Sequence, residues 1–195
     1  ALRRRFYALL TLRWLGTGIL IPFFVLVMQE RGLSLGQIGL VMALYGATVV
    51  VLELPTGSFA DSVGRRPTLL LAASAMLAGG TVFLVADEMG VFAIACGLLG
   101  VGRALDSGAL NAWFVDAALA IDPNADRRGA LSGAGAIGSS AIGIGALLGG
   151  ALPVALAFVG LGESAGGLAV PLVASLVVTL GYAVAITALV HEPSR

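Results

Sequence analysis

The sequence predicts an all-α, polytopic membrane protein, with six transmembrane helices arranged as two inverted three-helix repeats. Of its 195 residues, 58% are hydrophobic and 11% are charged, which is more apolar surface than a soluble domain of this length can bury in one core. The charges fall in clusters separated by apolar stretches of about 20 residues, the length that spans roughly 30 Å of hydrocarbon. The pattern Arg-x-Leu-x-Thr/Ser-Gly recurs at residues 13–18 and 103–108, at equivalent places in a three-plus-three arrangement. Chance is the alternative explanation of so short a match.

The apolar stretches define the expected spans in chain order. The first follows the arginines at 3–5 and is too long for the apolar region of a signal peptide. The second and fourth contain ionisable residues, whereas the third and sixth contain none. The fifth is overlong, and Gly149, Gly150 and Pro153 indicate either a kink or a helix that ends near Ala151. The expected spans are residues 6–28, 37–59, 67–86, 90–114, 129–159 and 168–190.

The arginines predict the orientation in the membrane, because cytoplasmic loops carry an excess of positive charge. Only Arg31 falls on one side of the expected topology. We therefore expect a multi-pass protein of a bacterial inner membrane, embedded in the lipid bilayer, with both termini cytoplasmic. The arginines on the cytoplasmic side are Arg3, Arg4, Arg5, Arg65, Arg66, Arg127, Arg128 and Arg195.

Composition excludes several classes of function. The net charge is zero, so there is no overall electrostatic attraction to nucleic acid. His191 is the only histidine and Cys96 the only cysteine, so the sequence offers no set of metal ligands or hydrolase catalytic residues. It also has no phosphate-binding Gly-Lys-Thr/Ser run. We expect no cofactor, no metal, no nucleic-acid partner and no enzymatic activity.

The segment between the second and third spans, residues 57–69 (GSFADSVGRRPTL), places one carboxylate beside two guanidiniums at a membrane surface. Such a cluster can hold a charge-paired latch. The segment resembles the signature loop of the major facilitator superfamily, Gly-x-Leu-Ala-Asp-x-x-Gly-Arg-Arg-x-x-Leu, with Phe59 in place of Leu. The resemblance implies a loop that helps to close a cytoplasmic gate. The residues of this motif are Gly57, Asp61, Gly64, Arg65 and Arg66.

The fourth and fifth spans extend the resemblance. Residues 99–108 (LGVGRALDSG) are similar to the superfamily's Leu-x-x-x-Arg-x-x-Gln-Gly pattern, with Asp106 at the Gln position and Gly108 one residue late. Residues 145–150 (GALLGG) are similar to the Gly-Pro-x-x-Gly-Gly motif of drug/proton antiporters, with Ala146 in place of Pro. The candidate residues of this helix-five motif are Gly145, Gly149 and Gly150.

A charge within hydrocarbon is costly unless it is paired or hydrated. Counted from the span centres, Arg103 lies near the middle of the membrane, and the other three ionisable residues of the spans lie about 4 to 8 Å toward the cytoplasm. On a continuous fourth helix, Arg103, Ser107 and Asn111 would form a polar stripe at i, i+4 and i+8 that faces a cavity. The ionisable residues within the spans are Arg13, Glu53, Arg103 and Asp106.

Two interpretations of these charges are open. In the first, Glu53 or Asp106 binds a proton, and a nearby arginine or solvent access sets the affinity, so that proton flow is coupled to alternating access. In the second, the charges form permanent ion pairs that fix helix packing. The predicted polar stripe favours the first.

Asp116 is expected at the cytoplasmic end of the fourth helix, about 15 Å beyond Asp106. In the superfamily, an acidic residue at this place pairs with arginines of the signature loop. The resemblance therefore implies a gate contact between Asp116 and Arg65 or Arg66. A solvated helix end is the alternative.

The resemblance implies a secondary transporter of small molecules that works by alternating access, and we expect proton-coupled efflux of amphipathic compounds. Because Ala146 departs from the antiporter motif, a facilitator or proton symporter for a sugar or metabolite is an alternative. A different class of function is a non-transporting membrane fragment or a dimerising membrane module. The superfamily pattern also implies a partner for this bundle, either a C-terminal six-helix half outside these residues or a second copy of the chain.

Overall fold

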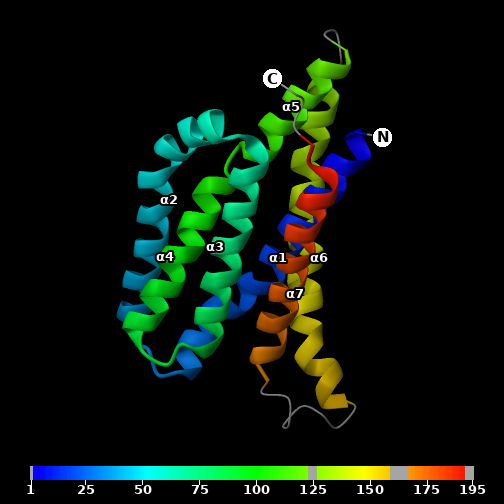
Figure 1. Ribbon diagram of the computed structural model, residues 1–195. Helices are drawn as coiled ribbons and strands as arrows, with labels where there is room; N and C mark the ends of the chain where they lie inside the picture. The colour runs from blue at the N-terminus through cyan, green and yellow to red at the C-terminus, as the bar shows by residue number, and fades with distance from the viewer. Residues whose placement is uncertain (1, 123–126, 159–166, 192–195) are drawn as a thin grey trace.

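The computed structural model describes residues 2–122, 127–158 and 167–191, and within these ranges helices joined by short connections make up the whole fold (Figure 1). Six spans are long and apolar enough to cross a membrane when α4 and α5 are counted together. The predicted all-α fold with six spans is thus confirmed. The helices are α1 (Leu2–Glu30), α2 (Leu35–Val63), α3 (Arg65–Val85), α4 (Met89–Asp106), α5 (Ala109–Ile121), α6 (Arg128–Phe158) and α7 (Ala169–Leu189).

The connection between α2 and α3 is shorter than the sequence indicated. α2 continues past Phe59 to Val63, so the first half of the segment expected as a loop forms the last turns of α2. Only Gly64 separates the two helices, with φ +112° and ψ +159°. This backbone conformation is accessible to glycine and disfavoured for residues with a Cβ atom. One residue therefore sets the reversal between two membrane spans.

The fourth span is interrupted, contrary to the continuous helix that was expected. α4 ends at Asp106, Ser107 has extended backbone, and Gly108 has the left-handed values φ +76° and ψ −22°. α5 then runs from Ala109 to Ile121. A left-handed residue breaks the α-helical ladder, and glycine takes that conformation without steric cost. The break divides the span into a long segment and a shorter one.

α6 is one helix that continues through Pro153 to Phe158, in agreement with the expected span, and the alternative of a helix end near Ala151 is not found. Within hydrocarbon, a helix that stopped early would leave backbone N–H and C=O groups without partners. A single proline is tolerated because it removes only one donor from the ladder. The expected last residue, Val159, lies outside the described residues, as does Arg195.

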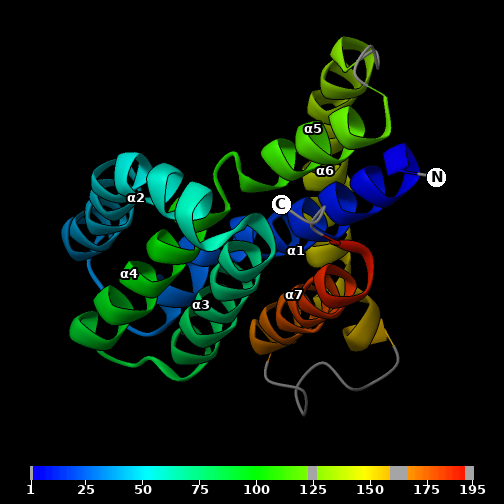
Figure 2. The same cartoon turned by 45° about the horizontal axis from the view of Figure 1, so that its top comes forward.

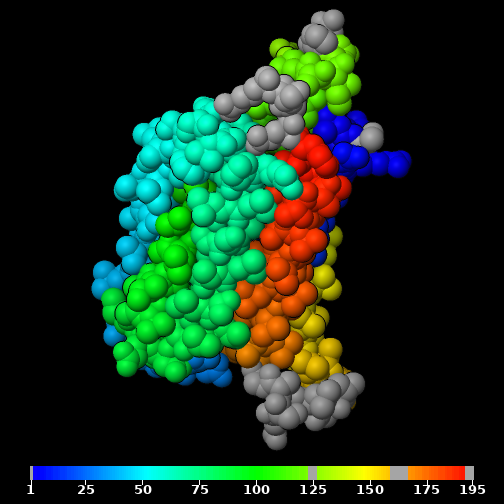
Figure 3. Space-filling model, in the orientation of Figure 1, coloured from blue at the N-terminus to red at the C-terminus, as the bar shows by residue number. Residues whose placement is uncertain are grey.

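The helices pack as two groups, and each group combines helices from both halves of the chain. α1 packs against α6 and α7, whereas α4 packs against α2 and α3, and Figures 1 and 2 show the two groups side by side. The groups meet where α3 contacts α7, which lie next to each other on the face drawn in Figure 3. In the chain, α1 precedes α2 and α3, and α4 precedes α6 and α7. Each three-helix repeat therefore contributes its first helix to the other repeat's group.

Glycines bring α1 and α6 close together. A Cβ atom at Gly145 would lie 2.6 Å from the carbonyl oxygen of Leu15, and one at Gly149 would lie 2.7 Å from that of Ile19. Gly150 is exposed, with no atom within 4 Å of its Cβ position. Two of the three glycines of the helix-five motif thus permit close helix packing, as small residues do in membrane bundles.

Large apolar side chains cover much of the outer surface. Leu54 on α2 is 87% exposed, and Phe158 on α6 is 90% exposed. Apolar side chains on an outer surface are stable when lipid is the solvent. Two buried clusters fill the interior, one around Phe6 and Trp113 and the other around Phe83 and Phe92. The chain is a multi-pass membrane protein with its polar interior groups between these clusters.

Candidate functional site

The centre of the site is an ion pair between α1 and α4. Arg13 Nε pairs with Asp106 Oδ2, and the two side chains are 8% and 0% exposed. The other carboxylate oxygen, Oδ1, accepts a hydrogen bond of 3.0 Å from the hydroxyl of Tyr182 on α7. Because Asp106 is the last residue of α4, this triad joins α1 and α7 to the point where the fourth span breaks.

A second arginine lies beside the triad without a carboxylate of its own. The guanidinium carbon of Arg13 lies 4.6 Å from the centroid of the Trp14 ring, and the guanidinium carbon of Arg103 lies 5.2 Å from it. Both distances are within the range of cation–π attraction. Among the described residues, Arg103 has no acidic group within ion-pair distance. Its charge therefore lies against the Trp14 ring, without an ion-pair partner of its own in the described part of the chain.

Glu53 lies apart from the triad, on the exposed side of α2. Its Oε1 accepts a hydrogen bond of 2.9 Å from the hydroxyl of Ser107, the first residue of the helix break. One turn further along α2, Thr56 donates to the carbonyl oxygen of Ala104 at 3.0 Å. The α2–α4 contact thus places a second carboxylate, outside the triad, against the break.

The expected polar stripe on the fourth helix is not formed as predicted. The helix break separates Arg103 on α4 from Asn111 on α5, so the i, i+4, i+8 spacing no longer places them on one face. Arg103 faces the interior, Ser107 binds Glu53, and Asn111 is exposed. The physical reason is the left-handed Gly108, which redirects the chain after Ser107.

A second Arg–Asp cluster lies at the end of the bundle where α2 meets α3. Arg65 NH2 is 2.7 Å from Asp61 Oδ1, four residues earlier, and Arg65 Nε is 3.4 Å from Asp116 Oδ2 on α5. The neighbouring Arg66 donates to the carbonyl oxygen of Thr187 on α7 at 3.0 Å. The segment therefore ties α2, α3, α5 and α7 together. Gly57, expected to bound a loop, is an exposed helical residue of α2.

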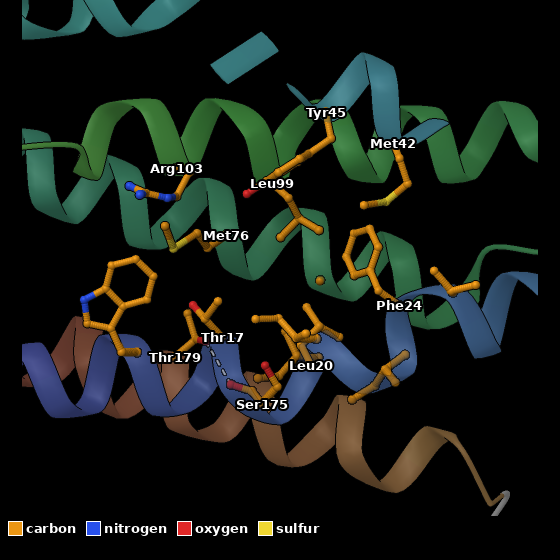
Figure 4. A pocket seen from close by; sticks show the side chains of 16 residues that line it. Thr17, Leu20, Phe24, Met42, Tyr45, Met76, Leu99, Arg103, Ser175 and Thr179 are labelled. Atoms are coloured by element: carbon orange, nitrogen blue, oxygen red, sulfur yellow. Dashed lines mark hydrogen bonds between the residues drawn. The ribbon is translucent and has the colours of Figure 1, made fainter. Parts of the chain in front are cut away.

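A cavity of about 420 Å³ lies between the two helix groups, next to the triad. Residues of α1, α2, α3, α4 and α7 line it, among them Trp14, and Figure 4 shows Arg103 at one end and Phe24 and Met42 at the other. The volume lies within the roughly 300–1,000 Å³ of small-molecule sites. The site thus combines a ligand-sized cavity, an ion pair buried beside it and an arginine without a carboxylate partner.

Comparison with known proteins identifies this architecture. A family model for the Major Facilitator Superfamily matches residues 6–154, which include both Arg–Asp clusters. The chain belongs to the major facilitator superfamily. It is similar to the inner membrane transport protein YajR of Escherichia coli (strain K12), with 31% identity over 104 residues, 52% of this chain and 21% of YajR. It is also similar to the uncharacterized MFS-type transporter YxaM of Bacillus subtilis (strain 168), with 26% identity over 109 residues, 56% of this chain and 27% of YxaM.

The alignments thus cover less than a third of either superfamily relative. The two Arg–Asp clusters of this superfamily member meet the fourth span on either side of its break. Asp106 of the triad ends α4, and Asp116, which pairs with Arg65, lies on α5. Sequence reasoning found the charged members of both clusters and expected a cavity beside the fourth span, but it missed Tyr182 and Trp14. Tyr182 is the one phenolic hydroxyl in a span without charged residues, and that is the sequence signal that points to it.

Proposed function

We propose that this chain is the N-terminal bundle of a secondary transporter that works by alternating access and exports small amphipathic compounds in exchange for protons. The observation that carries the proposal is the Arg13–Asp106 pair, buried beside a ligand-sized cavity between two helix groups. Membership of the superfamily supports transport as the class of function. In this proposal, the bundle lies in a bacterial inner membrane with both termini in the cytoplasm.

Asp106 is the proposed proton-binding residue. As a carboxylate, it holds Arg13 and accepts from Tyr182, so the ionised form links α1, α4 and α7. A protonated carboxyl has no charge with which to hold the arginine, and the link between the helices weakens. Proton binding at this point thereby changes the contact between the two helix groups. Charged groups buried in membrane spans commonly mark proton or substrate pathways.

Glu53 is the second proposed coupling residue. It faces outward from α2, the side on which a C-terminal half or a second copy would pack, and it binds the break through Ser107. Protonation of Glu53 would convert a charge-assisted hydrogen bond into a neutral one, about half as strong. Asp106 ends α4 and Glu53 binds the next residue, Ser107, which supports a shared role of the two carboxylates in moving α5 relative to α4.

The Arg65 cluster is the proposed cytoplasmic latch. Its contacts with Asp61 and Asp116 join the ends of α2 and α5, and all three side chains are at least partly exposed. Exposed ion pairs contribute about 0–1 kcal/mol each, so they can open and close without a large change in free energy. The excess of arginine at this end supports the cytoplasmic assignment.

Flux in proteoliposomes made with the full-length protein tests the proposal. The probe is 8-anilinonaphthalene-1-sulfonate, an amphipathic dye with one negative charge, and the driving force is an imposed pH gradient. We expect gradient-driven dye movement in the wild type, and loss of it in Asp106→Asn and Glu53→Gln. Asp87→Asn is the matched control, because Asp87 is an exposed carboxylate outside the spans. Absence of gradient-driven movement in the wild type, or unchanged movement in both variants, would overturn the proposal.

A second candidate is a facilitator or proton symporter for a sugar or metabolite, favoured by Ala146 at the Pro position of the antiporter motif. In the same liposomes, accumulation of solute in the direction of the proton gradient would support a symporter. A facilitator would give exchange without any effect of the gradient. A membrane module that acts by dimerising would show neither.

A further inference from the structure

The polar groups that line the cavity are unequal in their hydrogen-bonding capacity. The hydroxyls of Thr17, Ser175 and Thr179 donate to the carbonyl oxygens of Arg13, Gly16 and Ser175, at 3.2, 2.8 and 2.8 Å. A hydroxyl has one proton to donate, so these three side chains present only acceptor oxygen to a ligand. They do not provide donors for a negatively charged group.

The donors that face the cavity come from Arg103 and Tyr45. Neither side chain makes a hydrogen bond or an ion pair with the described part of the chain. In Figure 4, the Tyr45 hydroxyl points from α2 toward the Arg103 side of the cavity. A guanidinium fork offers two parallel N–H donors to a carboxylate. Arg103 and Tyr45 therefore line the cavity with donors that no described residue accepts.

The wall of the cavity carries a net positive charge. Asp106 neutralises Arg13, and Glu53 lies on the outer side of α2, bonded to Ser107. One positive charge, that of Arg103, therefore remains at the cavity wall in a low-dielectric surrounding. A cationic ligand would be repelled there, and a monovalent anion would compensate the charge.

The opposite end of the cavity is apolar. Phe24, Met42, Leu20 and Leu172 line it, and Figure 4 shows Phe24 and Met42 at a distance from Arg103. Such a wall favours a flat or bulky hydrocarbon body. The two ends together describe an amphipathic ligand with its charge at one end.

We propose that the cavity binds an amphipathic organic anion, with its carboxylate held by Arg103 and Tyr45 and its aromatic body against Phe24 and Met42. This inference rests on the proposed transport function and gives it a substrate class.

Equilibrium binding without any gradient tests the substrate class. Three probes share one ring system: naphthalene-2-carboxylate, the neutral naphthalene-2-carboxamide and the cationic 2-(aminomethyl)naphthalene. We expect isothermal titration calorimetry on the full-length protein in nanodiscs to show about tenfold to a hundredfold tighter binding of the carboxylate than of the carboxamide. The cation is expected to bind most weakly. Equal affinity for all three probes, a preference for the cation, or no carboxylate binding at millimolar concentration would overturn the inference.

Single substitutions test which side chains cause the preference for the carboxylate. Arg103→Gln is expected to abolish the preference for the carboxylate over the carboxamide, and Arg103→Lys to retain part of it through charge alone. Tyr45→Phe is expected to reduce it by several-fold. Arg4→Gln is the matched control, since it removes one exposed positive charge far from the cavity. A preference that survives in a folded Arg103→Gln protein contradicts the assignment. Intact probe binding in a protein whose flux ignores the pH gradient would instead contradict only the proton coupling.

Discussion

The molecule contains two Arg–Asp clusters of the same chemistry in different surroundings. Arg13 and Asp106 meet in the interior, with side chains 8% and 0% exposed. Arg65 meets Asp61 and Asp116 at the surface, with side chains 22%, 67% and 50% exposed. The clusters are mechanically connected, because Asp106 ends α4 and Asp116 lies on α5.

The difference in burial separates the roles of the two clusters. A buried ion pair is no better for stability than an apolar pair of similar volume, whereas loss of one partner leaves an uncompensated charge. An exposed pair contributes little in either direction. The interior cluster is therefore sensitive to any change of charge, as a proton-binding site must be. The surface cluster suits a contact that opens and closes in each cycle.

The largest expected effect is on the interior cluster. Arg13→Met leaves the Asp106 carboxylate buried without its cation, and we expect it to lower the free energy of unfolding by about 3–5 kcal/mol. The double variant Arg13→Met/Asp106→Leu removes both charges and is expected to recover most of that loss. Unfolding of the full-length protein in mixed micelles, by titration with SDS, measures both. A double variant as unstable as the single one would show that packing, and not the charge, is what Arg13 provides.

A smaller effect is expected from the third member of the triad. Tyr182→Phe removes a hydroxyl that donates to a charged carboxylate, at a cost of about 1.5–3 kcal/mol. Tyr7→Phe is the matched control, because the Tyr7 hydroxyl donates to the neutral carbonyl oxygen of Ala130 at 3.2 Å. That loss is expected to be about 0.5–1.5 kcal/mol. Equal losses in the same unfolding assay would indicate that Asp106 is not ionised in the folded protein.

The fold was largely predictable from the sequence, because charge-free stretches of membrane length determine how many helices cross. The break at Gly108 was not. Glycine is common within membrane spans, so Gly108 in an apolar run has no distinctive signal. The left-handed backbone at Gly108 follows two residues, Asp106 and Ser107, that contact other helices, and the sequence does not show those contacts. Likewise, Gly64 looked like one boundary of a loop, and only the three-dimensional structure shows that it is the whole connection.

The candidate site was predictable in its charges and not in its pairing. Arg13 and Asp106 were recognisable as ionisable residues at similar depth, yet the sequence gives no reason to pair Arg13 with Asp106 rather than with Glu53. Tyr182 is 76 residues from Asp106 in the chain, and its role depends on how α7 packs. Cavity shape arises from five helices at once, which no local pattern encodes.

The smallest expected effect is on the surface cluster. Asp116→Asn removes one of the two acidic partners of Arg65, which keeps Asp61, so we expect less than about 1 kcal/mol of destabilisation. The loss should shrink further as salt is raised to about 1 M, where the screening length is about 3 Å, whereas the loss in Arg13→Met should not. The same SDS titration at two salt concentrations measures this, with Glu30→Gln as a control at an exposed carboxylate, the last residue of α1. A salt-independent loss as large as that of Arg13→Met would remove the distinction between the two clusters and, with it, the proposal that the surface cluster opens easily.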